Sequence, residues 1–465
     1  MVTAADPKAL VLSGGGTRGA FEAGAIDLLV TQGMPCPEII TGTSAGSISA
    51  GVLAQARGEA ELAECAQTLK ADILAMTEID KVFAKTDWAK QLDGTPVGQL
   101  IDTLIGRGRP PVPVDPTLAD DPLAPFADGS GHKSSWKDLA GTMLHPGAVH
   151  RATKDFWNDP ASLMTLDPLE AALRGYGEAG ISKVDEDRIA RPGLTLRLTV
   201  SALQAGVPRY ITESGTMVDS DAVTPYPSGG TPGVISGMLA SSSVPVLFSP
   251  RLMGDDAYVD GGVLRNLPLE AAVFVGAGDV TAILANVTTA EPMKGPLDKL
   301  TLLEVYSRYG EIELFDQVVR SLTYPLKEGA TLTAVAPSMN VVAPFEVQQG
   351  LLLIDMDYGW MRAAEATDLD ASCQRIAQGM SDALTVGRIR AWYLEEMVIE
   401  ADVAGQEPAE DVAVALRSAK STVATQLASW RQWGLPTPSG ADAWATSAET
   451  HNRPLPDGWE KSLLG

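Results

Sequence analysis

The segment Gly42-Thr43-Ser44-Ala45-Gly46 has the residue types and spacing of a nucleophilic serine site. The pattern G-x-S-x-G is typical of a nucleophile elbow, a sharp strand-to-helix turn that presents the serine hydroxyl at the rim of a sheet. A β-branched stretch at 38–41 predicts the strand, and an alanine-rich stretch at 47–55 predicts the helix. Gly42 and Gly46 leave room where the two backbones close on each other. The pattern therefore predicts Ser44 as a nucleophile; the alternative is a turn in which Ser44 only caps the helix.

A glycine-rich loop near the start of the chain offers backbone amides to an anion. Gly14-Gly15-Gly16-Thr17-Arg18-Gly19 lies between a predicted strand at 9–13 and a predicted helix at 20–31. Amides at a helix N-terminus can stabilise the oxyanion of acyl transfer, and they can also hold a pyrophosphate. The second alternative fits the dinucleotide pattern G-x-G-x-x-G, with Glu38 about twenty residues further on, and predicts an oxidoreductase. We favour the oxyanion hole, because a dinucleotide site leaves the Ser44 segment unexplained.

A serine hydroxyl also needs a base to take its proton. Four histidines are present, and all lie in or beside Pro-rich stretches: His132, His145, His150 and His451. Asp260 is the better candidate, because it follows a short apolar stretch at 257–259 and precedes Gly261 and Gly262, which predict a tight turn. A carboxylate at the end of a strand can approach Ser44. The alternative is an aspartate that caps its own turn.

The order of these three segments resembles the patatin-like phospholipase family. That family has a glycine-rich loop of the type G-G-G-x-[KR]-G, then G-x-S-x-G, then D-G-G or D-G-A. The stretch at 237–250 also resembles the family block A-S-x-A-x-P-x-x-F-x-P, with Val244 at the second alanine position. The resemblance extends from about Lys8 to Val287 with a long interruption, and a fainter match lies near 351–364.

The resemblance implies a lipid acyl hydrolase with a Ser-Asp dyad, acting on phospholipid or related acyl esters without a cofactor or metal. Ser44 would be the nucleophile and Asp260 the proton acceptor. The oxyanion hole would come from the Gly14–Gly19 loop, with the amides of Gly15 and Gly16 as its donors. Arg18 would face the substrate phosphate or buttress the loop. A dinucleotide-binding oxidoreductase and a non-catalytic lipid-binding protein of the same fold are the alternatives.

The composition limits the partners and the compartment. The chain has 465 residues and a formal net charge of −24, which argues against nucleic acid and against long-range attraction to anionic membranes. Contact with a lipid surface would then depend on apolar area or a local basic patch. Three scattered cysteines favour a reducing compartment. We expect a cytoplasmic protein, with export without a cleaved signal peptide as the alternative; the sequence indicates no activating partner.

The pattern of elements predicts an α/β fold: a three-layer arrangement with a mostly parallel central sheet flanked by helices. We expect a hydrolase domain over 8–345, interrupted by an insert at about 70–192 that contains a Pro/Gly-rich loop at 106–135. A short strand is predicted at 351–354. A helical C-terminal region is predicted over 346–433, followed by an extended tail at 434–465.

Overall fold

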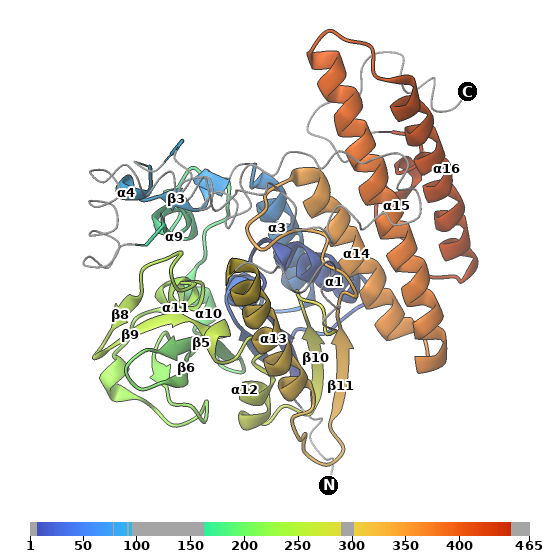
Figure 1. Cartoon of the computed structure of the whole chain (residues 1–465). Helices are drawn as coiled ribbons and strands as arrows, with labels where there is room; N and C mark the ends of the chain where they lie inside the picture. The colour runs from blue at the N-terminus through green and yellow to red at the C-terminus, as the bar shows by residue number, and fades with distance from the viewer. Residues whose placement is uncertain (1–6, 78, 91–92, 95–161, 290–301, 448–465) are drawn as a thin grey trace.

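The computed structural model describes residues 7–77, 79–90, 93–94, 162–289 and 302–447. A mixed β-sheet lies at the centre (Figure 1). Five neighbouring strands run parallel: β11 (Thr331–Val335), β10 (Asp279–Ile283), β1 (Lys8–Leu12), β2 (Ile39–Gly42) and β5 (Thr195–Ala202). Antiparallel strands extend the sheet beyond β5: β6 (Val207–Ile211), β7 (Met217–Val218), β8 (Arg251–Met253) and β9 (Asp256–Asp260). A separate two-stranded ribbon pairs β3 (Ala84–Lys85) with β4 (Met164–Thr165).

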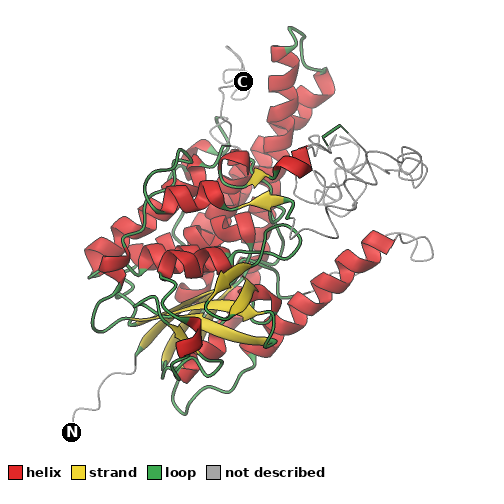
Figure 2. Cartoon of the chain, turned by 90° about the vertical axis from the view of Figure 1, so that its left-hand side faces the viewer, coloured by secondary structure: helices red, strands yellow, loops and turns green. Residues whose placement is uncertain are grey.

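Helices cover both faces of this sheet, as Figure 2 shows. Successive residues of β1 point to opposite faces, so that Leu10 and Leu12 join the larger hydrophobic core while Ala9 and Val11 join a smaller one. The larger core receives α1 (Gly19–Thr31), α2 (Ala45–Leu53), α3 (Glu59–Ala75), α11 (Val234–Ser241) and α14 (Gln349–Asp368). The smaller core receives α12 (Leu269–Phe274) and the end of α13 (Leu302–Leu322). The predicted α/β architecture is confirmed.

The remaining helices also contribute side chains to the larger core, among them Leu169, Ile189 and Trp392. Two long helices, α15 (Ala371–Val403) and α16 (Glu410–Gln432), follow α14 and pack against each other. Short helices are α4 (Asp87–Lys90), α9 (Asp167–Leu173) and α10 (Glu186–Ile189). A helical C-terminal region is therefore present, and α14 joins it to the main core through α1.

The register along β5 brings two distant segments together. Gly42 of β2 pairs with Leu198, and Asp260 of β9 pairs with Val200. Because β6 occupies the other edge of β5, β2 and β9 share one edge, and β9 continues where β2 ends. The chain that leaves β2 toward Ser44 therefore starts beside Asp260.

Three expectations are affected by the observed elements. The predicted strand at 351–354 is wrong, because these residues lie inside α14; a short apolar run does not distinguish a strand from a buried helix. The tail is not extended over its described part: a 3-10 helix forms at Ala441–Ala443, and Trp444 is buried with the Arg388 guanidinium 3.7 Å from its ring centroid. The predicted loop at 106–135 lies outside the described residues.

Candidate active site

Ser44 lies in a strained turn between β2 and α2. Its φ of 53° and ψ of −124° are unusual for a residue with a side chain. A Cβ on Gly42 would lie 2.3 Å from the Gly46 carbonyl oxygen, and one on Gly46 would lie 2.4 Å from the Ser13 carbonyl oxygen. The Ser44 amide donates to the Ser241 hydroxyl over 2.8 Å. The turn has the strand–turn–helix form of a nucleophile elbow, and both glycines have a steric reason. For Gly42 it is the predicted closeness of the helix that follows, whereas for Gly46 it is the end of β1.

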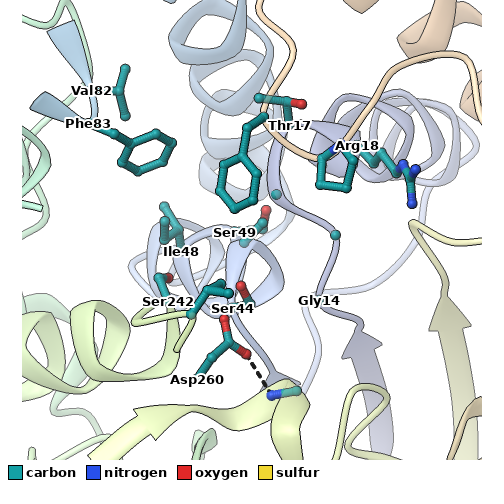
Figure 3. Close-up of a pocket in the computed structure, with 18 of the residues that line it drawn as sticks. Gly14, Thr17, Arg18, Ser44, Ile48, Ser49, Val82, Phe83, Ser242 and Asp260 are labelled. Atoms are coloured by element: carbon teal, nitrogen blue, oxygen red, sulfur yellow. Dashed lines mark hydrogen bonds between the residues drawn. The ribbon is translucent and has the colours of Figure 1, made fainter. Parts of the chain in front are cut away.

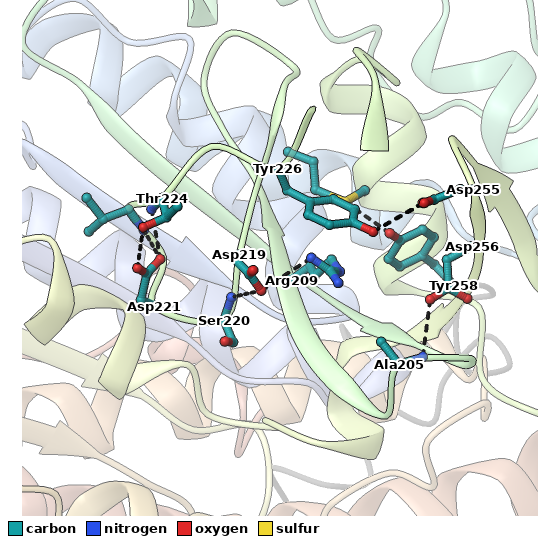
Figure 4. Close-up of polar contacts among 12 residues, drawn as sticks. Ala205, Arg209, Asp219, Ser220, Asp221, Thr224, Tyr226, Asp255, Asp256 and Tyr258 are labelled. Atoms are coloured by element: carbon teal, nitrogen blue, oxygen red, sulfur yellow. Dashed lines mark hydrogen bonds and ion pairs between the residues drawn. The ribbon is translucent and has the colours of Figure 1, made fainter. Parts of the chain in front are cut away.

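The carboxylate of Asp260 lies beside Ser44 in the same pocket (Figure 3). The side chain is 5% exposed at the end of β9. Its Oδ1 accepts the Gly262 amide over 2.6 Å, which uses the turn that Gly261 begins. Its Oδ2 is buried and makes no well-formed hydrogen bond to a described residue. One oxygen therefore fixes the orientation, and the other is available for a proton.

The surroundings of Asp260 make it a stronger base than an ordinary carboxylate. Burial raises the pKa of Asp260 from 3.8 to about 6, against the opposing effect of the Ser44 side chain and the Gly262 amide, which stabilise its charged form. A pKa nearer neutrality improves proton transfer from a hydroxyl, while the group stays ionised at pH 7.

The glycine loop lines the pocket, but most of its amides already donate hydrogen bonds to backbone carbonyls. The Gly14 amide donates to the Asn266 carbonyl over 3.0 Å, and the Arg18 amide to the Gly15 carbonyl over 3.3 Å. The Gly19 amide donates to carbonyls within the 3-10 turn at Gly16–Arg18. Among the described residues, the amides of Gly15 and Gly16 have no such acceptor. Of the loop amides, those of Gly15 and Gly16 are therefore the candidate donors to an oxyanion.

The Arg18 side chain supports the loop. Its Nε donates to the Val342 carbonyl over 2.9 Å, and one terminal nitrogen donates to the Asn286 side chain over 2.6 Å. Figure 3 shows the guanidinium directed away from Ser44. Of the two predicted roles for Arg18, these contacts favour buttressing over phosphate binding.

Ser44 and Asp260 line a cavity of about 540 Å³ with mainly apolar walls. Its lining includes Ile48, Val52, Ile73, Phe83, Phe248 and Phe345. The last three form a cluster with ring centroids 5.3 to 6.4 Å apart. Such a cavity suits an alkyl chain, because each buried methylene contributes about 0.8 kcal/mol.

The structure does not place the other residues considered in the sequence analysis at this site. Glu38 is exposed and precedes β2, at the opposite edge of the parallel strands from the glycine loop, so it cannot act as the ribose ligand of a dinucleotide site. All four histidines lie outside the described residues. Within the described part, no group of three or more potential ligands is arranged to hold a metal ion. No described helix combines the length and apolarity required to cross a membrane.

Sequence reasoning missed several residues that hold the loop. Asn286 follows β10, and the segment at 342–344 receives hydrogen bonds from Thr17 and Arg18. None of these residues belongs to a recognisable motif. Asn286 lies just beyond the carboxyl end of β10, and the carboxyl ends of parallel strands line sites in α/β sheets, but the sequence alone did not show where this strand ends.

A strained serine, a buried carboxylate and two loop amides without an acceptor among the described residues thus lie together at the rim of an α/β sheet. The model of the family described as patatin-like phospholipase matches residues 10–273. The chain belongs to this family, and at family level it is a lipid hydrolase.

Comparison with curated proteins finds no match. Among solved structures, the chain is similar to VipD from Legionella pneumophila, with 13% identity and a TM-score of 0.31, covering 99% of this chain and 90% of that one. It is also similar to ExoU from the type III secretion system of Pseudomonas aeruginosa, solved in complex with SpcU, with 17% identity and a TM-score of 0.22, covering 99% and 73%. Because both TM-scores are low, the family assignment rests on the family model.

Proposed function

We propose that this protein hydrolyses the acyl ester bond of phospholipids or related acyl esters with a Ser44–Asp260 dyad. The observation that carries the proposal is the pairing of the strained Ser44 with the buried Asp260 in one apolar cavity. A binding protein has no need of backbone strain at a serine, whereas a nucleophile gains exposure of its hydroxyl from it.

The first half of the reaction acylates the serine. Ser44 Oγ attacks the ester carbonyl carbon while its proton passes to Asp260 Oδ2. The carbonyl oxygen becomes an anion that accepts hydrogen bonds from the Gly15 and Gly16 amides. When the tetrahedral intermediate collapses, the alcohol leaves with the proton from Asp260, and the acyl group remains on Ser44.

The second half releases the fatty acid. A water molecule attacks the acyl-enzyme carbonyl and gives its proton to Asp260. The same amides stabilise the second oxyanion, and collapse returns the proton to Ser44 as the acid departs. Loss of one such amide donor typically costs a hundredfold to a thousandfold in rate, so the Gly15 and Gly16 amides contribute to catalysis alongside the dyad.

Ser44→Ala and Asp260→Asn test the proposal on a panel of phospholipids, lysophospholipids and p-nitrophenyl esters. Both variants should fold and lose at least about a thousandfold in kcat, because each removes a group that bonds with the reacting atoms. Glu38→Gln, at the far edge of the sheet, is the matched control and should retain full activity. Full activity in either dyad variant would overturn the proposal, and binding of the lipids without turnover by the unaltered protein would favour a lipid-binding role.

A further inference from the structure

Asn286 lies where it can act on the glycine loop. It follows β10, which runs parallel to β1, and the glycine loop follows β1. Both segments therefore leave the same edge of the sheet side by side. Asn286 is 6% exposed and lies outside the family match at 10–273 and outside all three motifs.

The two hydrogen bonds of Asn286 fix its orientation. Its Nδ2 donates to the Gly14 carbonyl over 2.6 Å, and its Oδ1 accepts from the Arg18 guanidinium over 2.6 Å. A carbonyl only accepts and a guanidinium only donates, so the side-chain amide has one satisfactory orientation. The Ser13 hydroxyl lies 3.4 Å from the same Gly14 oxygen, which makes Asn286 the closer donor.

The Gly14 carbonyl belongs to the same peptide unit as the Gly15 N–H. In a planar trans peptide the C=O and N–H point in opposite directions. Holding the Gly14 oxygen on one side therefore aims the Gly15 amide to the other. The restraint matters here because glycine residues rotate with little steric hindrance, and Gly14, Gly15 and Gly16 follow one another.

We propose that Asn286 is a positioning residue for ester hydrolysis: it anchors the Gly14–Gly15 peptide so that the Gly15 amide points at the oxyanion. The inference rests on the proposed function. Arg18 completes the anchor, because it holds Asn286 Oδ1 from the far side and is itself bonded to the Val342 carbonyl. The geometry of the oxyanion hole thus depends on a residue that lies outside the three motifs in the sequence but contacts the glycine loop in the fold.

Asn286→Asp and Asn286→Ala test the inference. The aspartate keeps the size of the side chain and the contact with Arg18, but presents an oxygen to the Gly14 carbonyl. Both variants should lower kcat about tenfold to a hundredfold, because a small misplacement of a donor loses transition-state stabilisation. KM for a soluble ester should stay near its original value. Inhibition by an alkyl trifluoromethyl ketone, whose hemiketal oxyanion occupies the hole, should weaken by the same factor as kcat.

Gln55→Glu is the matched control. The Gln55 amide also makes two hydrogen bonds, to the Val52 carbonyl and from the Asp185 amide, but it does not contact the glycine loop. It should retain kcat and inhibitor affinity. If Asn286→Ala fails to fold, the isosteric aspartate variant decides.

Unchanged kcat in Asn286→Asp would overturn the inference, since that variant replaces the donor to the Gly14 carbonyl with an oxygen and keeps the contact with Arg18. A parallel loss of kcat and of affinity for a product fatty acid would also overturn it, because that pattern indicates general damage to the cavity. Failure of the proposed function is recognised separately: in that case Ser44→Ala keeps its activity, whatever Asn286 does.

Discussion

Ser44 is held in a backbone conformation that disfavours every residue except glycine, at φ 53° and ψ −124°. Such strain costs on the order of 1–3 kcal/mol and is typical of functional sites. Ser44→Gly should therefore unfold at higher urea concentration than Ser44→Ala, although both lack the nucleophile. We expect a difference of about 1 kcal/mol in the free energy of unfolding. Equal stability of the two variants would show that the turn stores no strain.

The environment of Asp260 predicts the acid limb of the pH–rate profile. Its pKa is about 6, and only the ionised carboxylate can accept the Ser44 proton. kcat/KM should therefore be level above this pH and fall about tenfold per pH unit below it. Measurement on a soluble ester between pH 4.5 and 8, with buffers of about equal ionic strength, checks this. A profile without this limb would mean that Asp260 is not the base.

The burial that makes Asp260 a stronger base also makes its ionised form destabilise the folded protein. Its pKa rises from 3.8 to about 6 on folding, so the folded protein binds the proton more tightly than the unfolded chain. Tighter proton binding stabilises the folded state below pH 3.8, and this stabilisation is lost as the pH rises to about 6. Asp260→Asn, which stays neutral, should gain stability relative to the original protein between pH 4 and 7, by up to about 3 kcal/mol. Chemical unfolding at several pH values tests this; a stability difference independent of pH would contradict it.

At the scale of elements, the sequence predicted the strand, turn and helix around Ser44 because each carries a local signal. The adjacency of Ser44 and Asp260 has no local signal: it depends on β2 and β9 following each other along one edge of β5. The fold of residues 351–354 was missed because a short apolar run fits a strand as well as a buried helix. Asn286 was missed because its partner is a backbone carbonyl that any residue can supply.

A close contact between α1 and α14 packs the C-terminal helices against the helix that follows the glycine loop. A Cβ on Gly24 would lie 1.7 Å from the Met356 carbonyl oxygen, and one on Gly359 would lie 1.9 Å from the Phe21 carbonyl oxygen. The two helix backbones are thus in direct contact, and α1 begins where the glycine loop ends.

Gly359→Ala should force these helices apart. We expect it to destabilise the protein by about 1–3 kcal/mol, as overpacking does, and to lower kcat by shifting the loop. Gly379→Ala is the control: it lies inside α15 with no atom within 4 Å of the added methyl, and should stabilise by up to about 1 kcal/mol. Thermal unfolding and ester assays on both variants measure this. Equal effects of the two substitutions would argue against the close helix contact.

At the scale of the whole molecule, the net charge of −24 should govern the choice of lipid surface. Repulsion keeps the protein from anionic vesicles at low salt, and screening shortens its range from about 30 Å at 0.01 M to about 8 Å at 0.15 M salt. Hydrolysis of anionic vesicles relative to zwitterionic ones should therefore increase with added NaCl. A decrease would indicate that a local basic patch, rather than the net charge, controls docking.

Labelling with an alkyl fluorophosphonate tests the central claim most directly, because the reagent attaches covalently to a serine that a base has activated. Intact-mass and peptide analysis should find one adduct per chain, on Ser44, with no adduct in Ser44→Ala and strongly slowed labelling in Asp260→Asn. Labelling of another residue, or an Asp260→Asn variant that reacts as fast as the original protein, would contradict the dyad.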